Sequence, residues 1–103
     1  MKLLIRGGSI AAGHGVDKSY VDILRTVLRN KGIDVMNRSR YRDTSFDGIE
    51  TFAADIDVIR PEMLLIHFGV DDAFSSVYRS EFQENIVRII RRARTHGNPD
   101  IFL

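Results

Sequence analysis

The segment that decides the fold runs from Leu3 to Gly15 and reads LLIRGGSIAAGHG. It begins with an apolar run short enough for a buried strand, breaks into Gly7-Gly8-Ser9, and leads toward a helical pattern near Asp17. A serine in this place follows the carboxyl end of a strand, where parallel α/β sheets bind their ligands. Two interpretations are open: a chemically active serine, or a tight turn whose serine bonds only to the local backbone.

The rest of the chain alternates between strand and helix patterns. Short apolar runs predict strands over 2–6, 33–37, 63–66 and 100–103. Apolar residues at helical spacing predict three helices. The first runs from about residue 17 to Gly32, with Ile23 and Val27 on its buried face, and the second runs over 46–60 and ends before Pro61. The third begins at Ser80, where Ser-Glu-Phe-Gln has the form of a capping box, and Val87 is among its buried residues. Right-handed crossovers then predict a three-layer α/β fold with a parallel sheet in the strand order 2-1-3-4.

This strand order places the loops after the first and third strands side by side. Ser9 from one loop and Asp71-Asp72 from the other are therefore expected to line one crevice at the switch point of the sheet. The pair of loops favours the chemically active interpretation of Ser9 over the local turn.

Composition narrows the classes of function. The chain has 103 residues, the size of one domain, and a net charge of +1, so no strong field attracts nucleic acid or a membrane surface. It has no cysteine, which excludes disulfides and thiolate metal sites, and no apolar run approaches the roughly 20 residues that span a bilayer. Because Met1-Lys2 leads directly into the first strand, we expect no signal peptide and a cytoplasmic location.

Metal and cofactor sites have little support in the sequence. His67 with Asp71-Asp72 offers ligand types, but adjacent residues at a strand end diverge and three ligands at useful spacing are not evident, so we expect no metal and no cofactor. The glycine-rich segment matches neither a Walker P-loop nor a Gly-x-Gly-x-x-Gly fingerprint. A receiver-like signalling domain shares the topology but needs acidic residues where Gly7-Gly8 stands.

Three loops carry motifs in the order of a known family. Gly7-Gly8-Ser9 with Gly13 matches Gly-Asp-Ser-x-x-x-Gly, the segment Asn37–Thr44 matches Asn-x-x-x-x-Gly-Asp-Thr, and Gly69–Asp72 matches Gly-x-Asn-Asp. The chain resembles the SGNH (GDSL-type) hydrolases, which are serine esterases on a flavodoxin-like sheet. The resemblance implies that residues 1–103 form a single, incomplete domain that lacks the family's fifth strand and C-terminal helix.

The resemblance also implies roles for individual residues. Ser9 would be the nucleophile, and Ser9, Arg42 and Asp71 would stand at the three oxyanion-hole positions. The residues expected around the substrate pocket are Gly8, Gly69 and Asp72. Gly8 replaces the family's aspartate, Arg42 replaces its glycine, and Asp71 replaces its asparagine. The last change matters most, because an ionised aspartate only accepts hydrogen bonds and repels a developing oxyanion.

The family's catalytic base has no counterpart in the sequence. No Asp-x-x-His occurs, and for His14, His67 and His96 a structural or solvent-exposed role is favoured over catalysis. We therefore expect a hydrolase of small acyl esters by resemblance, inactive as this chain alone. The alternative is a pseudoenzyme that binds an anion or small molecule near Arg38, Arg40 and Arg42.

The fourth strand, at an open sheet edge, is expected to pair with a second copy as a dimer or by strand swapping.

Overall fold

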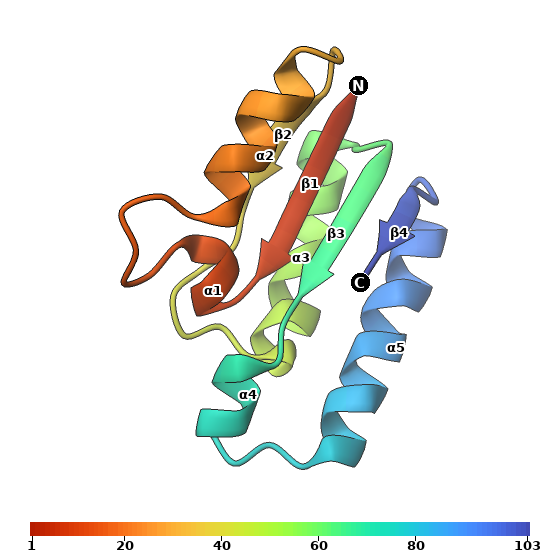
Figure 1. Ribbon diagram of the computed structural model, residues 1–103. Coiled ribbons are helices and arrows are strands. Elements are labelled where there is room, and N and C mark those ends of the chain that lie inside the picture. Colours follow the sequence, from red (N-terminus) through yellow and green to blue (C-terminus); the bar gives the residue numbers. More distant parts are fainter.

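A computed structural model describes all 103 residues, which form four strands and five helices (Figure 1). In chain order the elements are β1 (Lys2–Gly7), α1 (Ser9–Ala12), α2 (Tyr20–Arg29), β2 (Asp34–Asn37), α3 (Ser45–Ile59), β3 (Met63–His67), α4 (Val70–Phe74), α5 (Arg79–Thr95) and β4 (Asp100–Phe102).

The four strands form one parallel sheet in the order β2-β1-β3-β4, as the sequence predicts. The registers Leu4↔Met36 and Leu4↔Leu64 place β1 between β2 and β3. All strands end at the same side of the sheet because they are parallel, so the loops after β1, β2 and β3 meet there. This edge carries α1 and α4 (Figure 1).

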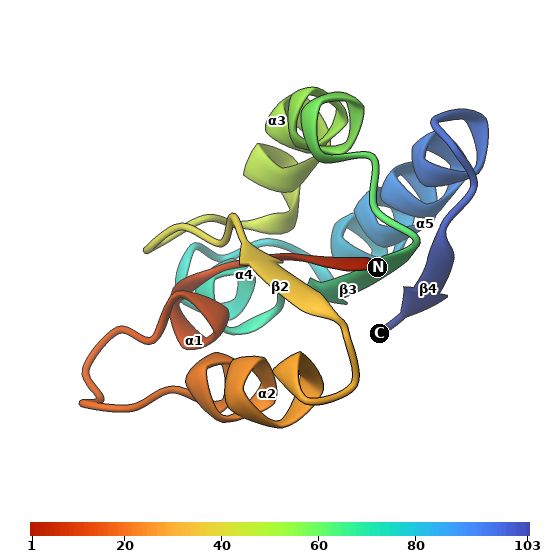
Figure 2. The same ribbon diagram turned by 90° about the horizontal axis from the view of Figure 1, so that it is seen from above.

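Helices cover the two faces of the sheet unequally (Figure 2). On one face α3 and α5 pack over a nine-residue core that includes Leu4, Phe52 and Leu64. On the other face α1 and α2 cover β1 and β2 through a five-residue core that includes Ile5 and Val21. No helix lies over β4 on that second face, and a cavity of about 370 Å³ opens there between Tyr20, Leu65, His67 and Leu103.

The helix ends follow local hydrogen bonds. Ser19 and Thr44 cap α2 and α3 with reciprocal bonds to Asp22 and Asp47. The start of the last helix differs from the sequence prediction: α5 begins at Arg79, because the Tyr78 N–H donates to Glu81 Oε1 over 3.0 Å and Ser80 lies inside the first turn.

Three predicted core positions are wrong. Ile23, Val27 and Val87 are exposed by 53%, 51% and 38%. The apolar residues of α2 and α5 cover a wider face of each helix than the part that packs against the sheet. These three side chains lie at the margin of that face and are exposed to solvent. No helix in the chain is both long and apolar enough to cross a membrane.

Candidate active site

Ser9 lies at the carboxyl edge of the sheet, directly after β1. It is the first residue of α1, a single turn that ends at Gly13 with a left-handed φ of 81°. The sequence suggested a loop here, because four helical residues are too few to produce a period. The turn holds the Ser9 hydroxyl toward the loops that follow β2 and β3.

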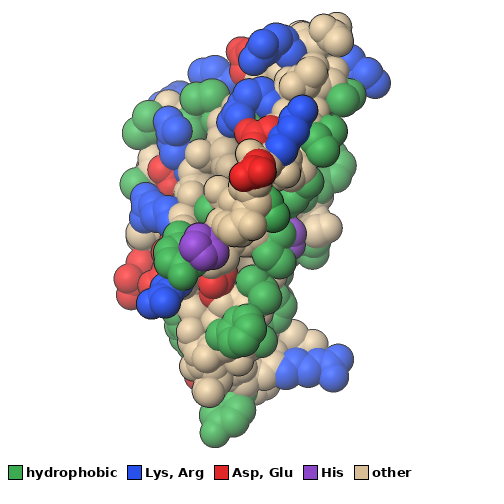
Figure 3. All heavy atoms as spheres, turned by 60° about the vertical axis from the view of Figure 1, so that its left-hand side comes forward, with side chains coloured by type: hydrophobic (Ala, Val, Ile, Leu, Met, Phe, Trp, Pro, Cys, Tyr) green, Lys and Arg blue, Asp and Glu red, His purple; other side chains and the backbone are tan.

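A cavity of about 590 Å³ opens at Ser9. The residues that line it are Ser9, Ile10, His14, Tyr41, Arg42, Val70, Asp71, Phe74 and Ser75. Figure 3 shows the face on the side of α1, where histidine, acidic, basic and apolar side chains gather around hollowed surface. The cavity therefore has an apolar wall from α1 and α4, and a polar wall with both signs of charge.

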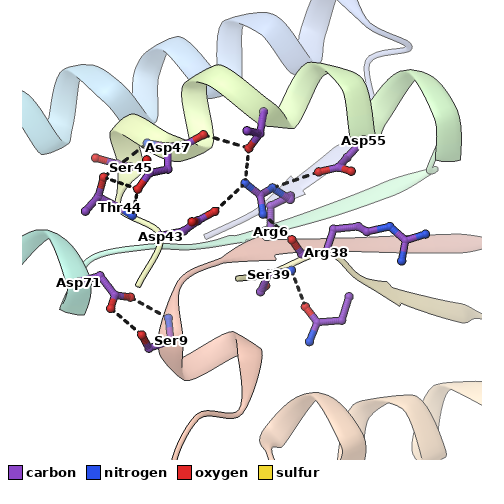
Figure 4. Close-up of polar contacts among 12 residues, drawn as sticks. Arg6, Ser9, Arg38, Ser39, Asp43, Thr44, Ser45, Asp47, Asp55 and Asp71 are labelled. Atoms are coloured by element: carbon purple, nitrogen blue, oxygen red, sulfur yellow. Dashed lines mark hydrogen bonds and ion pairs between the residues drawn. The ribbon is translucent and has the colours of Figure 1, made fainter. Parts of the chain in front are cut away.

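Three hydrogen bonds join Ser9 to the other two loops, and Figure 4 shows the two that Ser9 makes with Asp71. The Ser9 hydroxyl donates to Asp71 Oδ1 over 2.6 Å, and the Ser9 N–H donates to Asp71 Oδ2 over 2.7 Å. The Arg42 N–H donates to Ser9 Oγ over 2.9 Å. The structure thus brings together Ser9, Arg42 and Asp71, the three residues placed at the oxyanion positions by resemblance.

Gly8 has no space for a side chain. A Cβ at this position would overlap Asp71 Oδ2 and stand 2.5 Å from the carbonyl oxygen of Asp43. The backbone of Gly8 itself, with φ −100°, does not need a glycine. Glycine stands here because the Asp71 carboxylate fills the space in which the family's aspartate would begin.

Asp72 does not line the cavity, in contrast to its predicted place in the substrate pocket. Its side chain is buried and accepts hydrogen bonds from the Ser45 N–H at 3.0 Å and from the Ser45 hydroxyl. Asn85 of α5 donates to the same hydroxyl over 3.0 Å. Asp72 therefore joins α4 to α3 and α5. Gly8 and Gly69 also lie outside the cavity lining, Gly69 as the residue before α4 with a φ of 142°.

The three histidines occupy three different places. The His14 ring lies in the cavity wall and stacks on Tyr41, with centroids 3.9 Å apart. His67 Nδ1 is 2.7 Å from the Tyr20 hydroxyl, whose pKa is raised by burial. His96 Nδ1 is 2.8 Å from Asp57 Oδ1, at the end of α5 away from Ser9. None of the three is hydrogen-bonded to Ser9, and no group of three potential metal ligands occurs.

Arg6 carries an ionic network beneath the loop that contains Arg42. Its side chain is fully buried and contacts Asp43, Thr51, Asp55 and the carbonyl oxygen of Arg38. Burial lowers the pKa of Arg6, and the two aspartates oppose this effect. Burial also raises the pKa of Asp43, against the opposing effect of Arg6. Sequence analysis did not single out Arg6, although an arginine inside a buried apolar strand is itself a signal, because such a charge needs partners.

The sequence also did not predict some of the residues that line the cavity. Ile10, Tyr41, Val70, Phe74 and Ser75 had no predicted role. Val70 and Phe74 belong to α4, whose five residues are again too short for a periodic signal. Their exposure, 87% for Phe74, is the signal that only the structure supplies.

Comparison with known proteins identifies the family. Residues 6–103 match the model of the GDSL-like Lipase/Acylhydrolase family, and the chain belongs to this family. Esterase TesA of Pseudomonas aeruginosa is 31% identical over 99 residues, which cover 92% of this chain and 49% of TesA. The uncharacterized lipoprotein YqeF of Bacillus subtilis is 30% identical over 92 residues, which cover 84% of this chain and 37% of YqeF.

Solved structures agree with this assignment. A crystal structure of TesA superposes with a TM-score of 0.89 at 28% identity, over 98% of this chain and 58% of the crystallised chain. AlinE4, an SGNH-hydrolase family esterase, superposes with a TM-score of 0.85 at 27% identity, over 97% of this chain and 56% of AlinE4. The chain thus has the flavodoxin-like α/β fold of the SGNH hydrolases and spans about half the length of the relatives it matches.

The comparisons do not address where the protein is located, so the cytoplasmic location stays a prediction.

Proposed function

We propose that these residues carry the nucleophile part of a serine esterase that acts on small acyl esters. The observation that carries the proposal is the convergence of three loops on one hydroxyl: Ser9 Oγ faces a cavity, accepts the Arg42 N–H, and donates to Asp71. Family membership supports it, as do the names of two relatives, Esterase TesA and the arylesterase of Vibrio mimicus.

The reaction would proceed through an acyl-enzyme. Ser9 Oγ attacks the ester carbonyl carbon while its proton passes to a base, and the alcohol leaves with a proton returned by that base. Water then attacks the acyl-Ser9 ester and releases the carboxylic acid. We assign the Ser9 N–H and the Arg42 N–H as the donors to the oxyanion. The Arg42 N–H donates to Ser9 Oγ itself, and the Ser9 N–H donates to Asp71 Oδ2, whose carboxylate also accepts the Ser9 hydroxyl.

Two features restrain this chemistry in the chain by itself. No histidine is hydrogen-bonded to Ser9, so the usual base for a serine is lacking. The Asp71 carboxylate holds the Ser9 N–H, and as an anion it would repel the oxyanion that the same N–H must bind. We therefore propose that residues 1–103 are inactive, or nearly so, without an Asp-His pair supplied by further polypeptide.

Reaction with a fluorophosphonate probe tests this function. The probe is offered to the chain alone and to a fusion in which the C-terminal half of TesA follows residue 103, and tandem mass spectrometry locates the adduct. We expect an adduct on Ser9 in the fusion, its loss in Ser9→Ala, and its retention in Ser75→Ala, which removes another hydroxyl of the same cavity. A folded fusion without a Ser9 adduct would contradict the proposal.

The alternative is a pseudoenzyme that binds an anion or small molecule without reaction. The Asp71 contact favours it, because the carboxylate already satisfies both the hydroxyl and the N–H of Ser9. Arg42 and His14 in the cavity lining would face the ligand. Thermal-shift measurements with inorganic phosphate, nucleotides and short acyl esters distinguish the two: stabilisation by phosphate or nucleotide alone, in a protein whose Ser9 never reacts, supports the pseudoenzyme.

We also propose that the 103-residue polypeptide forms dimers through β4. This strand has β3 as its only neighbour, and Phe102 and Leu103 are exposed by 51% and 76%. An unpaired edge with apolar side chains favours pairing with another copy. Light scattering after size exclusion should give a dimer mass, and a Phe102→Lys variant should shift it toward monomer. A wild-type monomer at all concentrations would contradict this proposal.

A further inference from the structure

The buried guanidinium of Arg6 contacts the loop after β2 at both of its ends. One amino group donates to the carbonyl oxygen of Arg38, where the loop begins. The other donates to Asp43 Oδ2 over 3.4 Å, where the loop ends, and to Thr51 Oγ1 of α3 over 2.6 Å. Figure 4 shows this cation between β1 and α3, with the Asp43 carboxylate directed toward it and the Arg38 side chain directed away, so that Arg38 contacts the cation through its carbonyl oxygen.

Between these two contacts the loop adopts a conformation that its sequence does not favour. Arg42 has a φ of 67°, in the left-handed region where a side chain is strained and glycine is not. This conformation directs the Arg42 N–H to Ser9 Oγ, 2.9 Å away. A strained residue persists only where its surroundings hold it, so something outside Arg42 must stabilise this backbone.

The contacts of the loop show what holds it. The N–H groups of Arg38 and Arg40 donate to the carbonyl oxygens of Ile5 and Gly7, which fix the first half of the loop along β1. In the second half, the Asp43 N–H donates to the carbonyl oxygen of Arg40 over 3.2 Å and closes a turn around Arg42, but no backbone bond joins this half to β1. The Asp43 side chain, paired with Arg6, ties this turn to the strand. The contact of Arg6 Nε with Asp55, an ion pair at 3.5 Å, joins the same cation to α3 and not to the loop.

We infer that Arg6 is a positioning residue, which acts through Asp43 to keep Arg42 in the left-handed conformation that presents its N–H to Ser9. The inference rests on the proposed function only in so far as that N–H serves the oxyanion. Because an arginine stands where the family motif has glycine, the ion pair of Arg6 with Asp43 supplies a restraint that glycine would make unnecessary. Thr51 and the Arg38 carbonyl oxygen accept further hydrogen bonds from the two amino groups of the cation.

Two matched variants test this role without the risk of an unpaired buried cation. Asp43→Ala removes the ion pair with the loop, and Asp55→Ala removes the ion pair with α3. Each variant leaves Arg6 with one aspartate and with its hydrogen bonds to Thr51 and the Arg38 carbonyl. The readout is the solvent-exchange rate of the Arg42 amide in ¹⁵N-labelled protein, with amides of α5 as a reference for global stability. We expect Asp43→Ala to raise the Arg42 exchange rate about tenfold or more relative to α5, since a charge-assisted contact is lost, and Asp55→Ala to leave it within about twofold.

A rescue experiment separates positioning from a general loss of structure. In an Arg42→Gly background the left-handed conformation needs no external restraint, so Asp43→Ala should raise the exchange rate of the residue-42 amide by less than in the Arg42 background. Equal effects of Asp43→Ala and Asp55→Ala, or no rescue by glycine, would overturn the inference. Neither readout uses a substrate or probe, so an unreactive Ser9 would refute the proposed esterase and leave this result standing.

Discussion

Asp71 and Asp72 are adjacent in the first turn of α4, yet they belong to two regions of different character. Asp71 faces an open cavity and binds Ser9, a residue of the neighbouring loop. Asp72 is only 2% exposed and binds Ser45, which in turn receives a hydrogen bond from Asn85. One carboxylate belongs to the site, and the other to the scaffold behind it.

The difference shows how the fold separates stability from chemistry. The Asp72 region is sealed between three helices, so its polar groups must satisfy one another. The Asp71 region opens to solvent, so its carboxylate can change without leaving a buried group unpaired. Two departures from the family pattern, Arg42 and Asp71, line the open cavity, and the third, Gly8, is buried against the Asp71 carboxylate.

Loss of Asp72 should have the largest effect on stability. Asp72→Ala removes the acceptor for the Ser45 N–H and hydroxyl in a buried site, which should lower the free energy of unfolding by about 2–4 kcal/mol. Asp71→Ala is the matched control and should cost less than about 1 kcal/mol, because solvent reaches its partners. Urea denaturation measures both. Equal losses would show that the two regions do not differ as described.

A methyl group at Gly8 should have the second-largest effect on stability. Gly8→Ala places a Cβ against Asp71 Oδ2 and the Asp43 carbonyl oxygen, so we expect a loss of about 1–3 kcal/mol, the cost of overpacking. Adding Asp71→Ala removes one of the two clashes, and the double variant should therefore be more stable than the sum of the single effects. Additive losses in denaturation would mean that Gly8 and Asp71 are not coupled.

The smallest effect concerns the pH dependence contributed by Asp43. Burial raises its pKa in the folded protein above the ordinary 3.8, so folding favours the protonated form. This contribution to stability is present below the ordinary pKa and is lost as the pH rises through the folded value. Melting temperatures of wild type and Asp43→Asn should accordingly differ more in favour of wild type at pH 3 than at pH 7. The opposite trend would contradict the assigned direction.

The sequence predicted the frame of the molecule well, for physical reasons. The apolar runs at 2–6 and 63–66 are too short for helices and too apolar for an exposed edge, so central parallel strands followed. The order β2-β1-β3-β4 then brought the Ser9 and Asp71 loops together. These inferences rest on the burial of the strands, which the apolar pattern of the sequence indicates, and on the right-handedness of crossover connections, which holds for parallel sheets in general.

Side-chain direction within the loops could not be predicted in the same way. Asp71 and Asp72 are identical and adjacent in the sequence, and only the turn of α4 sends one to the cavity and the other to Ser45. The left-handed backbone of Arg42 was equally hidden, because the residue that signals this conformation, glycine, does not stand at the position. Tertiary contacts decide such positions, and no local pattern encodes them.

The central claim is that Ser9 is the nucleophile position of an SGNH site whose oxyanion groups are held by Asp71. Its most direct test uses the fusion with the C-terminal half of TesA, which supplies the Asp-His pair. The rate of fluorophosphonate reaction at Ser9 is measured in the Asp71→Asn fusion and in the unsubstituted fusion, with Asp72→Asn as the matched control. An asparagine can donate to the oxyanion and carries no charge, so we expect a rate at least about tenfold higher in Asp71→Asn and no such gain in Asp72→Asn. A folded Asp71→Asn fusion that reacts at Ser9 no faster than the unsubstituted fusion would contradict the account.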